Sequence, residues 1–379
     1  MMSQRSKREL LERIRPRYLK AAKKEKQTIL NEFVATTGYH RKYANRLLKQ
    51  GASRKRAKPK GRKKIYQGEV VVVLTRIWEI CGRICSKRLH PFLPEMVKVL
   101  ERHDELHLSE ETRDLLLQMS RSTIDRCLQP ARFEQRKGLS TTKPGSLLKK
   151  AIPVRTFADW DDARPGFLEI DLVAHCDGSV AGQYLNTLTA VDIATGWVEC
   201  VPILHRSQIM VSAAICKLRE RLPFDLLGLD SDNGGEFINE TLYRYCLDEE
   251  ITFTRSRPYK KNDQAHVEQK NWSIVRSLIG YDRFETQEEL DLLDAIYQQL
   301  RFYSNFFQPV LKLTSKERVG DKIVRHHDLA ATPYHRVLQS EQVPMQVKAN
   351  LINLYLQLNP VTLRKDIDAL VGKLWKVIR

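Results

Sequence analysis

The sequence predicts an α/β domain built on a mixed five-stranded sheet, with an all-α region before it and a helical region after it. Three observations lead to this prediction. Residues 167–279 alternate short apolar runs, rich in Leu, Ile, Val and Thr, with segments of helical period. Residues 4–50 and most of 286–379 show only the helical period. A chain of 379 residues is long enough for two or three domains.

The composition is that of a globular protein in water. Hydrophobic residues make up 42% of the chain, and the mean hydropathy is −0.43. No apolar run approaches the about 20 residues of a membrane span. The charged N-terminus lacks the apolar core of a signal peptide. Seven cysteines without dense spacing indicate free thiols in a reducing compartment. We therefore expect a cytoplasmic protein.

The net charge of +18 is confined to one end of the chain. Residues 1–64 hold 22 Lys and Arg against 4 Asp and Glu, whereas the other 315 residues hold 42 of each kind. A concentrated excess of this kind favours a polyanionic partner, and we expect double-stranded DNA. A solubilising tail is the alternative. An anionic membrane surface is less favoured, because the cations flank a compact helical pattern instead of lining one amphipathic helix.

Residues 1–50 are predicted to form a helix-turn-helix DNA-binding domain. Apolar residues recur on one face of 26–36 and of 40–50, and Gly38 lies in the turn between them. The second helix of such a pair enters the major groove. Its outward cations are predicted DNA contacts: Arg41, Lys42, Arg46 and Lys49. An ordinary helical hairpin is the alternative.

Residues 51–64 are predicted to be a basic linker, because alanine is their only apolar residue type. An extended cationic segment suits phosphates or a narrow minor groove. The predicted DNA contacts are Arg54, Lys55, Arg56, Lys58, Lys60 and Arg62. A solvated spacer is an equally good interpretation.

Residues 65–129 are predicted to form a second helical domain, in which helix-turn-helix character and DNA binding are left open. Helical periods cover 70–83 and 94–102, and Ser109 and Ser122 are the expected caps of two further helices. A zinc site of Cys81, Cys85, His103 and His107 is disfavoured, because both cysteines lie in an apolar helical pattern. Residues 130–165 form the expected connector to the next domain.

Residues 166–285 contain the predicted sheet. The expected strands are 167–174, 184–193, 197–204, 226–231 and 251–256, and the expected helices are 207–222, 238–249 and 263–279. Three antiparallel strands are thus followed by helix, strand, helix, strand and helix. This is a ribonuclease-H-like order of elements. The remaining residues, 286–379, are expected to form a helical C-terminal region.

Three acids of this domain are expected to meet in space. Asp171 lies in the middle of an apolar strand, where a carboxylate is costly unless it binds a cation or a partner. Asp232 ends a strand, at the edge where open sheets bind ligands. Glu268 begins a helix. Three hard oxygen ligands suit Mg²⁺ or Mn²⁺, and two such ions support phosphodiester chemistry. The alternative is three unrelated surface acids.

Two further acids compete with this assignment. Asp230 lies two residues before Asp232, on the same face of the predicted strand. Asp192 is a weaker candidate, since it is expected to turn the chain at a strand end.

Several segments together resemble bacterial insertion-sequence DDE transposases (ISNCY-like) with a retroviral-integrase-type catalytic core. These segments are 167–175, 232–240, 257–264, 267–271 and 305–309, and 35 residues separate the last two acids. The resemblance covers about residues 155–320. It favours Asp232 over Asp230, because the motif's acid directly precedes Asn-Gly.

The resemblance implies metal-dependent cleavage of DNA 3′ ends and strand transfer of an insertion sequence. Asp171, Asp232 and Glu268 are then both the catalytic residues and the metal ligands, with two Mg²⁺ or Mn²⁺ ions in each active site. It also implies a homo-oligomer that holds transposon ends and target DNA, in the bacterial cytoplasm and associated with the nucleoid.

Polar neighbours of the three acids are expected to support them. Asn233, Asn262, Gln264 and Asn271 are predicted to orient metal ligands or the DNA end, and Lys260, Lys261 and Lys270 to meet phosphates. A solvated loop is the alternative for the lysines. Trp272 stands where a small residue is expected.

The C-terminal region has expected helices at 287–303, 342–356 and 362–377, with an aromatic loop at 304–309. Its apolar stripes fit packing within the chain or contact between protomers, and we leave both open. Two other functions also stand: a non-enzymatic DNA-binding regulator derived from a transposase, and a ribonuclease-H-like nuclease. The intact acid triad favours an enzyme over the regulator. Joined DNA products would distinguish the transposase from the nuclease.

Overall fold

The computed structural model describes residues 2–51, 65–133, 164–179, 181–232, 234–237, 239–256, 264–319 and 322–377. The chain forms two compact units, Met1–Ile65 and Tyr66–Arg379, and each is described by itself. Within the described residues, no helix has both the length and the apolar character that a membrane crossing requires. The domain boundaries drawn above stay predictions.

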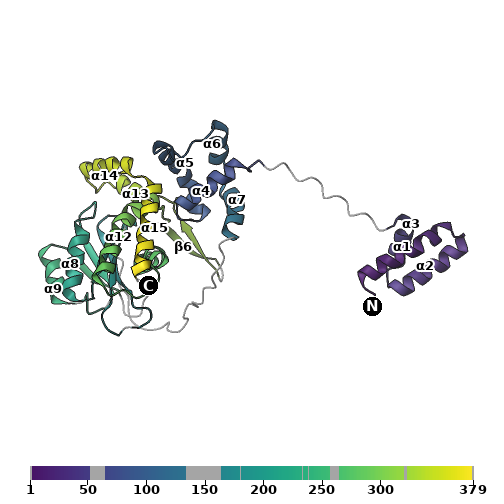
Figure 1. The fold of residues 1–379 in the computed structure, drawn as a ribbon, viewed down its shortest axis with the longest axis horizontal. Helices are drawn as coiled ribbons and strands as arrows, with labels where there is room; N and C mark the ends of the chain where they lie inside the picture. Colours follow the sequence, from purple (N-terminus) through teal and green to yellow (C-terminus); the bar gives the residue numbers. More distant parts are fainter. Residues whose placement is uncertain are drawn as a thin grey trace. The chain divides into compact units, whose positions relative to one another are not determined.

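The first unit is a bundle of three helices, α1 (Gln4–Lys20), α2 (Lys23–Thr37) and α3 (Arg41–Gln50) (Figure 1). Its core contains Phe33 and Leu48, neither of which is exposed. Gly38 ends α2 with a φ of 68°, in the left-handed region that glycine adopts without strain. The predicted all-α N-terminal region is therefore present, and its helix-turn-helix assignment stays a prediction.

The second unit begins with four helices, α4 (Glu69–Ile80), α5 (Ser86–Arg102), α6 (Glu110–Leu117) and α7 (Arg121–Phe133). Ser109 caps α6 as predicted, since its hydroxyl accepts the Thr112 N–H. The prediction for α7 was wrong by two residues. Ser120 is the cap, because its Oγ accepts the Thr123 N–H, and Ser122 lies inside the helix.

The sheet consists of β1 (Phe167–Ala174), β2 (Asn186–Asp192), β3 (Val198–Ile203), β4 (Gly228–Ser231) and β5 (Thr252–Arg255). The strand order is β3-β2-β1-β4-β5. The first three strands are antiparallel, and β4 and β5 run parallel to β1. The mixed five-stranded sheet that the sequence predicts is thereby confirmed. Its strand ends differ from the predicted ones by a few residues.

Helices cover both faces of the sheet. On one face, α8 (Gln208–Arg219) and α9 (Glu240–Asp248) pack on Leu168, Ile170 and Leu229. On the other lie α12 (Gln287–Phe307) and the helix of 265–279. This helix is α10 (Ala265–Lys270), a π-helical segment η3 (Asn271–Arg276) and α11 (Ser277–Ile279). Because strand side chains alternate, the even residues of β1 face α8 and its odd residues face α10.

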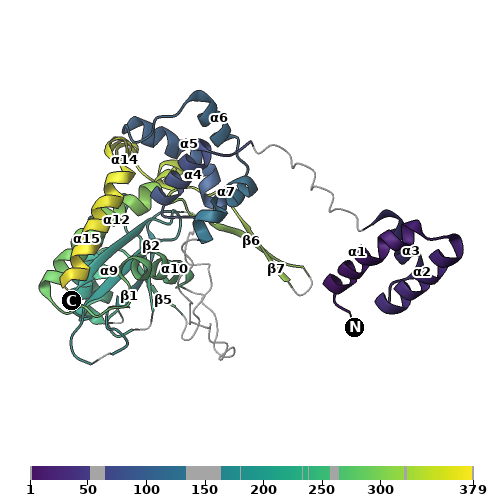
Figure 2. The ribbon, with the colours of Figure 1, turned by 45° about the vertical axis from the view of Figure 1, so that its right-hand side comes forward.

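The sequence predicted a helical C-terminal region, and this prediction was wrong in part, because the region also contains two strands. It contains α13 (Pro333–Gln339), α14 (Met345–Gln357), α15 (Pro360–Val377) and a hairpin of β6 (Leu313–Val319) and β7 (Lys322–His327). Figure 2 shows the hairpin extending away from the helices, whereas α15 lies beside α12. The hairpin escaped prediction because its described side chains are mostly exposed, so no buried alternation marks the strands.

The predicted aromatic loop at 304–309 begins as the last turn of α12, which ends at Phe307. Phe306 stacks on Tyr334 at a centroid distance of 4.9 Å, as part of an aromatic cluster with Tyr355. Asn305 is fully buried and bonds both backbone groups of Val198 on β3. The α4–α7 helices share this core with α12 and α15.

Candidate active site

Two neighbouring strands bring acids side by side. Glu169 and Asp171 both face α10, since they are two residues apart on β1. Glu169 is the register partner of Asp230 on the parallel strand β4. Asp232 follows the end of β4, and the same register carried two residues further sets it opposite Asp171. The sheet edge thus carries an inner row, Glu169 and Asp230, and an outer row, Asp171 and Asp232.

Glu169 ties the helix that carries Glu268 to β1. Its Oε2 accepts the backbone N–H groups of His266 at 2.9 Å and Val267 at 3.0 Å. These groups belong to the first turn of α10 and have no partner within the helix. A buried carboxylate here also suits the positive end of the helix dipole. Sequence reasoning missed this contact, for which the only available signal was a glutamate within the apolar strand, two residues before Asp171.

Asp171 is held from two sides. Its Oδ1 accepts the Leu172 N–H at 2.8 Å, and its Oδ2 accepts the Asn271 side-chain amide at 2.7 Å. Asn271 is the first residue of the π-helical segment, a feature that often occurs at functional sites. The predicted supporting residue Asn271 therefore contacts a predicted metal ligand. Its own Oδ1 is buried and has no hydrogen-bond partner among the described residues.

The charges of Asp232 and Glu268 both act on Asp171. The pKa of the Asp171 carboxyl is raised to about 7, chiefly by burial, with a further contribution from these two negative charges and an opposing one from the two hydrogen bonds. Glu268 itself is exposed. In the described part of the chain, no three Asp, Glu, His or Cys side chains already enclose a metal position. The acids face a common region without forming a closed cluster.

The two rival aspartates occupy different environments. Asp230 is fully buried, and its Oδ1 accepts the Thr254 hydroxyl at 2.8 Å. Asp232 is partly exposed, and its Oδ1 accepts the Gly234 N–H at 2.9 Å. A Cβ at Gly234 would lie 2.9 Å from that oxygen, so a side chain there displaces the carboxylate. Asp230 belongs to the interior, whereas Asp232 is open to a ligand.

The donor set fits a hard divalent cation. Carboxylates of Asp171, Asp232 and Glu268 and the unpartnered Oδ1 of Asn271 offer oxygen only, which Mg²⁺ and Mn²⁺ prefer. A buried acid that repels two others loses its proton more easily when a cation balances the charge. Asp192 is no competitor. It accepts bonds from Gly166 and Thr195 and turns the chain after β2.

Two further predicted site residues, Gln264 and Lys270, lie in the described part of the chain. Gln264 is buried and donates to the Asp230 carbonyl at 3.3 Å. Lys270 lies near Arg88 and Cys200, and burial lowers its pKa to about 8. Its phosphate contact stays a prediction. Several other predicted residues lie outside the described part of the chain: Asn233, Lys260, Lys261 and Asn262 of the predicted catalytic domain, and Arg54, Lys55, Arg56, Lys58, Lys60 and Arg62 of the predicted linker.

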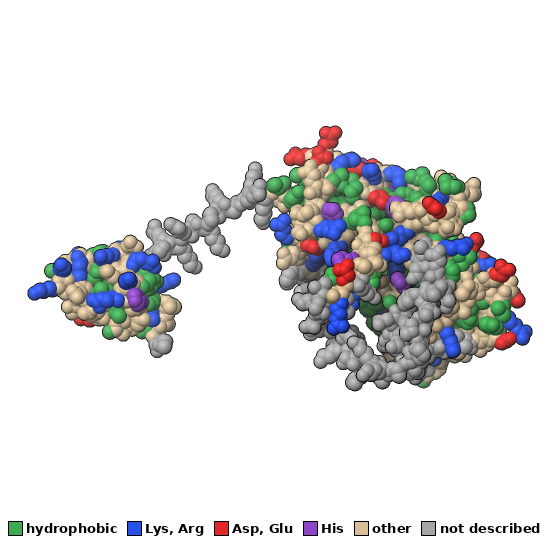
Figure 3. All heavy atoms as spheres, turned by 180° about the vertical axis from the view of Figure 1, so that it is seen from behind, with side chains coloured by type: hydrophobic (Ala, Val, Ile, Leu, Met, Phe, Trp, Pro, Cys, Tyr) green, Lys and Arg blue, Asp and Glu red, His purple; other side chains and the backbone are tan. Residues whose placement is uncertain are grey.

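The predicted cations of the first unit are all exposed on α3: Arg41, Lys42, Arg46 and Lys49. Arg46 lies over the Tyr43 ring at 5.1 Å, and Arg41 donates to Asn31. Figure 3 shows Lys and Arg side chains on the surface of this unit. The helix therefore offers a basic outer face while Ala44, Leu47 and Leu48 fill the core.

Comparison with known proteins gives one relative of nearly full length. No family model matches the chain. The chain is 44% identical over 332 residues to a Sinorhizobium fredii (strain NBRC 101917 / NGR234) protein named "Uncharacterized protein y4rM", covering 86% of this chain and 94% of that protein. The chain belongs to the y4rM family.

Solved structures similar to this y4rM-family chain include two retroviral integrase cores. One is the catalytic core domain of BIV integrase, with a TM-score of 0.32, 24% identity, and coverage of 46% of this chain and 95% of that one. The other is the HTLV-2 integrase catalytic core domain in complex with magnesium, with a TM-score of 0.31, 16% identity, and coverage of 40% and 93%. Both TM-scores are low.

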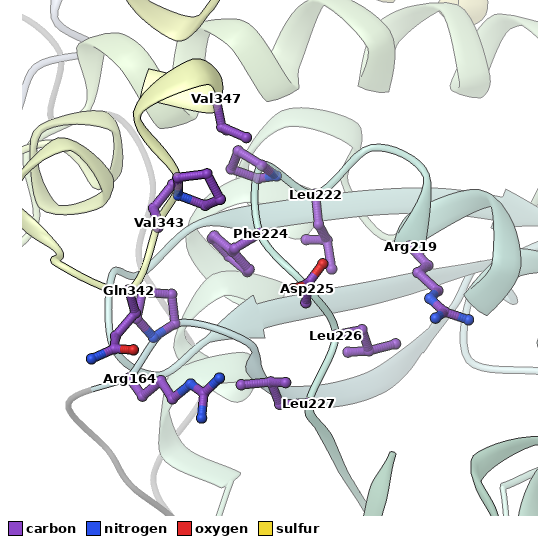
Figure 4. Close-up of a pocket in the computed structure, with 13 residues that line it drawn as sticks. Arg164, Arg219, Leu222, Phe224, Asp225, Leu226, Leu227, Gln342, Val343 and Val347 are labelled. Atoms are coloured by element: carbon purple, nitrogen blue, oxygen red, sulfur yellow. The ribbon is translucent and has the colours of Figure 1, made fainter. Parts of the chain in front are cut away.

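The y4rM-family chain also has a pocket of about 320 Å³ beside the segment that leads into β4 (Figure 4). Its lining combines Leu222, Phe224 and Leu226 with Val343 and Val347 from the region of α14. None of the three acids lines it. The pocket is therefore separate from the candidate active site.

Proposed function

We propose that this chain is a DNA transposase of the polynucleotidyl-transferase type, which cleaves DNA 3′ ends and transfers them to a target. The observation that supports it most is that two acids from other elements act electrostatically on Asp171. Asp171 comes from mid-strand, Asp232 from a strand end and Glu268 from a helix start, and the latter two raise the pKa of the first.

Asp171, Asp232 and Glu268 are the proposed holders of two Mg²⁺ or Mn²⁺ ions. Bound ions supply Lewis acidity for the attacking and leaving oxygens of an in-line displacement. In end cleavage, water attacks the phosphorus and the bond to the 3′ oxygen breaks, which leaves a 3′ hydroxyl. In strand transfer, that hydroxyl attacks a phosphodiester of the target, and one phosphorus–oxygen bond replaces another.

The chain's own contribution is to place these acids before DNA arrives. Glu169 fixes the start of α10 and with it Glu268. Asn271 and the Leu172 N–H fix both oxygens of Asp171, and the Gly234 N–H orients Asp232. Carboxylates held this way need little rearrangement during the reaction, which is the usual source of catalytic electrostatics.

The first unit is the proposed DNA-finding part. Its four exposed cations on α3 suit the phosphates and base edges of a major groove. The rest of the chain is close to electrically neutral, with 42 cations and 42 anions after residue 64. We assign recognition of the transposon ends to the first unit and chemistry to the second. Assembly as a homo-oligomer on DNA is part of the proposal, because two DNA ends must be held together while they are transferred to the target.

The test uses the DNA that flanks the gene as substrate, sequenced to find terminal inverted repeats. Full-length protein is incubated with labelled end DNA, target DNA and Mg²⁺ or Mn²⁺. We expect 3′-end cleavage and joined products from the unaltered protein. Asp232→Asn should abolish joining and retain DNA binding, whereas Asp248→Asn, on the far end of α9, should join normally.

Three outcomes of this test are informative. Joining by Asp232→Asn at the unaltered rate contradicts the proposal. Cleaved but unjoined products from the unaltered protein indicate a nuclease instead of a transposase. Binding without any metal-dependent cleavage indicates a regulator.

A further inference from the structure

Trp272 lies on the helix of residues 265–279, and packing does not explain why a tryptophan is found at this position. The indole is 66% exposed, whereas Val267, Val275 and Ile279 of the same helix are fully buried. Trp78 and Trp197, by contrast, are each only 3% exposed. Among the described residues, Trp272 has no stacking or cation partner. A bulky apolar side chain is thus presented to solvent from an otherwise well-packed helix.

Its position on the helix sets it beside the acids. Val267, Asn271 and Val275 face the sheet at steps of four residues, and Asn271 touches Asp171. The residue directly after each of them is Glu268, Trp272 and Arg276, respectively. These three residues are also four apart, so they form a second row along one side of the helix. The π-helical segment keeps this row aligned, since the Ser277 N–H bonds the Trp272 carbonyl five residues back.

The other two members of the row are already assigned by their contacts. Glu268 affects the pKa of Asp171 and belongs to the acid cluster. Arg276 donates to the Ala174 carbonyl at 2.7 Å and lies over the Tyr281 ring at 4.8 Å, which fixes it at the end of β1. Trp272 lies between them in this row, on the side of the helix that carries Glu268, and its indole is exposed.

The chemistry of an indole limits what can bind there. It has one N–H and no positive charge, so it is poorly suited to a phosphate beside three acids. Its flat face suits a nucleobase, and base–aromatic stacking contributes about 1–3 kcal/mol per base. Asp171 is partly buried, so a scissile phosphate at a duplex end reaches it more easily when the neighbouring base pair opens. An opened base needs a new stacking partner.

We propose that Trp272 is a stacking platform for one unpaired base of the DNA end, next to the scissile phosphate. This inference rests on the proposed function, because it takes DNA as the substrate of the acid cluster. It assigns to the protein a preference for ends whose terminal pair opens readily. It also gives a reason for a tryptophan where the sequence pattern predicts a small residue.

The first experiment reads stacking without catalysis. End oligonucleotides carry 2-aminopurine at each terminal position in turn and are mixed with full-length protein in the Asp232→Asn background. We expect quenching at one position, lost with Trp272→Ala and partly retained with Trp272→Phe. Tyr243→Ala is the matched control, because Tyr243 is 51% exposed on α9. Equal quenching with and without Trp272, at equal DNA occupancy, overturns the proposal.

The second experiment measures cleavage with an intact triad. Trp272→Ala should cleave paired ends about 5- to 100-fold more slowly, in line with the loss of one stacked base. An abasic nucleotide at the quenched position should slow the unaltered protein by a similar factor and Trp272→Ala no further. Additive losses overturn the proposal. A fall in oligomer mass with Trp272→Ala, without any change in quenching, assigns the indole to a second copy and also overturns it.

These outcomes are separable from failure of the proposed function. If the unaltered protein does not cleave DNA, the proposed function fails, and the quenching measurement still decides whether Trp272 contacts a base. If the unaltered protein cleaves and Trp272→Ala cleaves equally fast, only the stacking inference fails. Because Trp272 is exposed, the thermal midpoint of Trp272→Ala should stay within a few degrees of that of the unaltered protein. An unchanged midpoint excludes misfolding as the cause of slower cleavage or lost quenching.

Discussion

Glu169 accepts the backbone N–H of Val267 at 3.0 Å, so a strand residue holds the helix that carries Glu268. The same oxygen accepts the His266 N–H at 2.9 Å. Both contacts join residues almost a hundred positions apart in the chain. The distance between the acids on the sheet and the acid on the helix is therefore set by a side chain that is itself buried away from the substrate.

Glu169→Ala is expected to impair catalysis through Glu268. Without the carboxylate, two backbone N–H groups at the start of α10 lose their partner, and the helix start becomes free to shift. A misplacement of about 1 Å costs on the order of 100-fold in rate. We expect a loss of 10-fold or more in the cleavage rate, and a higher Mg²⁺ concentration at half-maximal rate.

The conservative variant and a control separate positioning from general damage. Glu169→Gln keeps one acceptor oxygen and should recover part of the rate and of the Mg²⁺ dependence. Glu240→Ala removes an exposed glutamate that pairs with Arg244 on α9, and both readouts should be unchanged. An unaltered Mg²⁺ dependence in Glu169→Ala would argue that the helix start is held by other contacts.

Asp171 should make the stability of the protein depend on pH. The pKa of its carboxyl is about 7 in the folded chain, which is above the pKa of about 3.9 that an aspartate has in an unfolded chain. The folded state therefore holds this proton more tightly. The associated stability is complete below pH 4 and is lost as the pH rises through 7. Asp171→Asn has no such proton to lose, so it should melt at a higher temperature than the unaltered protein at pH 8.

Thermal melting at pH 5 and pH 8 checks this sign. The advantage of Asp171→Asn should be large at pH 8 and small at pH 5. Adding Mg²⁺ at pH 8 should raise the midpoint of the unaltered protein more than that of the variant, because the cation balances the same charge. A variant that melts lower at pH 8 would show that the ionised carboxylate is already stabilised without a cation.

Local patterns in the sequence predicted the sheet well, because the apolar pattern of each strand matches how that strand is buried in the sheet. Strands β2 and β3 are buried at every position, and β1 alternates between two cores. The same signal located Asp171 in mid-strand and Asp232 at a strand end. The choice of Asp232 over Asp230 came from the motif context, and the structure adds that Asp230 is fully buried.

Other features depend on contacts between distant residues, which local patterns do not contain. The role of Glu169 follows from its contact with α10, and the exposure of Trp272 follows from which face of its helix packs on the sheet. The β6–β7 hairpin is mostly exposed and lacks a buried alternation. Ser120 and Ser122 are equally good caps by residue type, and only the backbone geometry selects Ser120.

Asn305 is expected to contribute strongly to stability. Its side chain accepts the Val198 N–H at 2.9 Å and donates to the Val198 carbonyl at 2.8 Å, in a fully buried place. Asn305→Ala leaves both backbone groups unpaired, at about 1–3 kcal/mol each. Urea unfolding should show a loss of about 2–6 kcal/mol. Asn350→Ala, on the exposed side of α14, should stay within about 0.5 kcal/mol of the unaltered protein. Equal urea midpoints for the two variants would contradict the role assigned to the hydrogen bonds between Asn305 and Val198.

The salt dependence of DNA binding tests which unit holds the phosphates. Removing two phosphate contacts should lower the slope of log K against log salt by about 2, since each contact contributes about 0.9. Arg46 and Lys49 are exposed on α3, whereas Lys373 and Lys376 are exposed on α15, so the two pairs are matched in charge.

Replacing Arg46 and Lys49 with Ala should flatten the slope, and replacing Lys373 and Lys376 with Ala should leave it unchanged. A variant lacking residues 1–64 should show the largest effect, because that segment holds 22 of the 64 Lys and Arg and all of the excess charge. Equal slopes for the two double variants would instead place the phosphate contacts outside α3. The first helical unit would then lose its assigned part in finding the DNA ends.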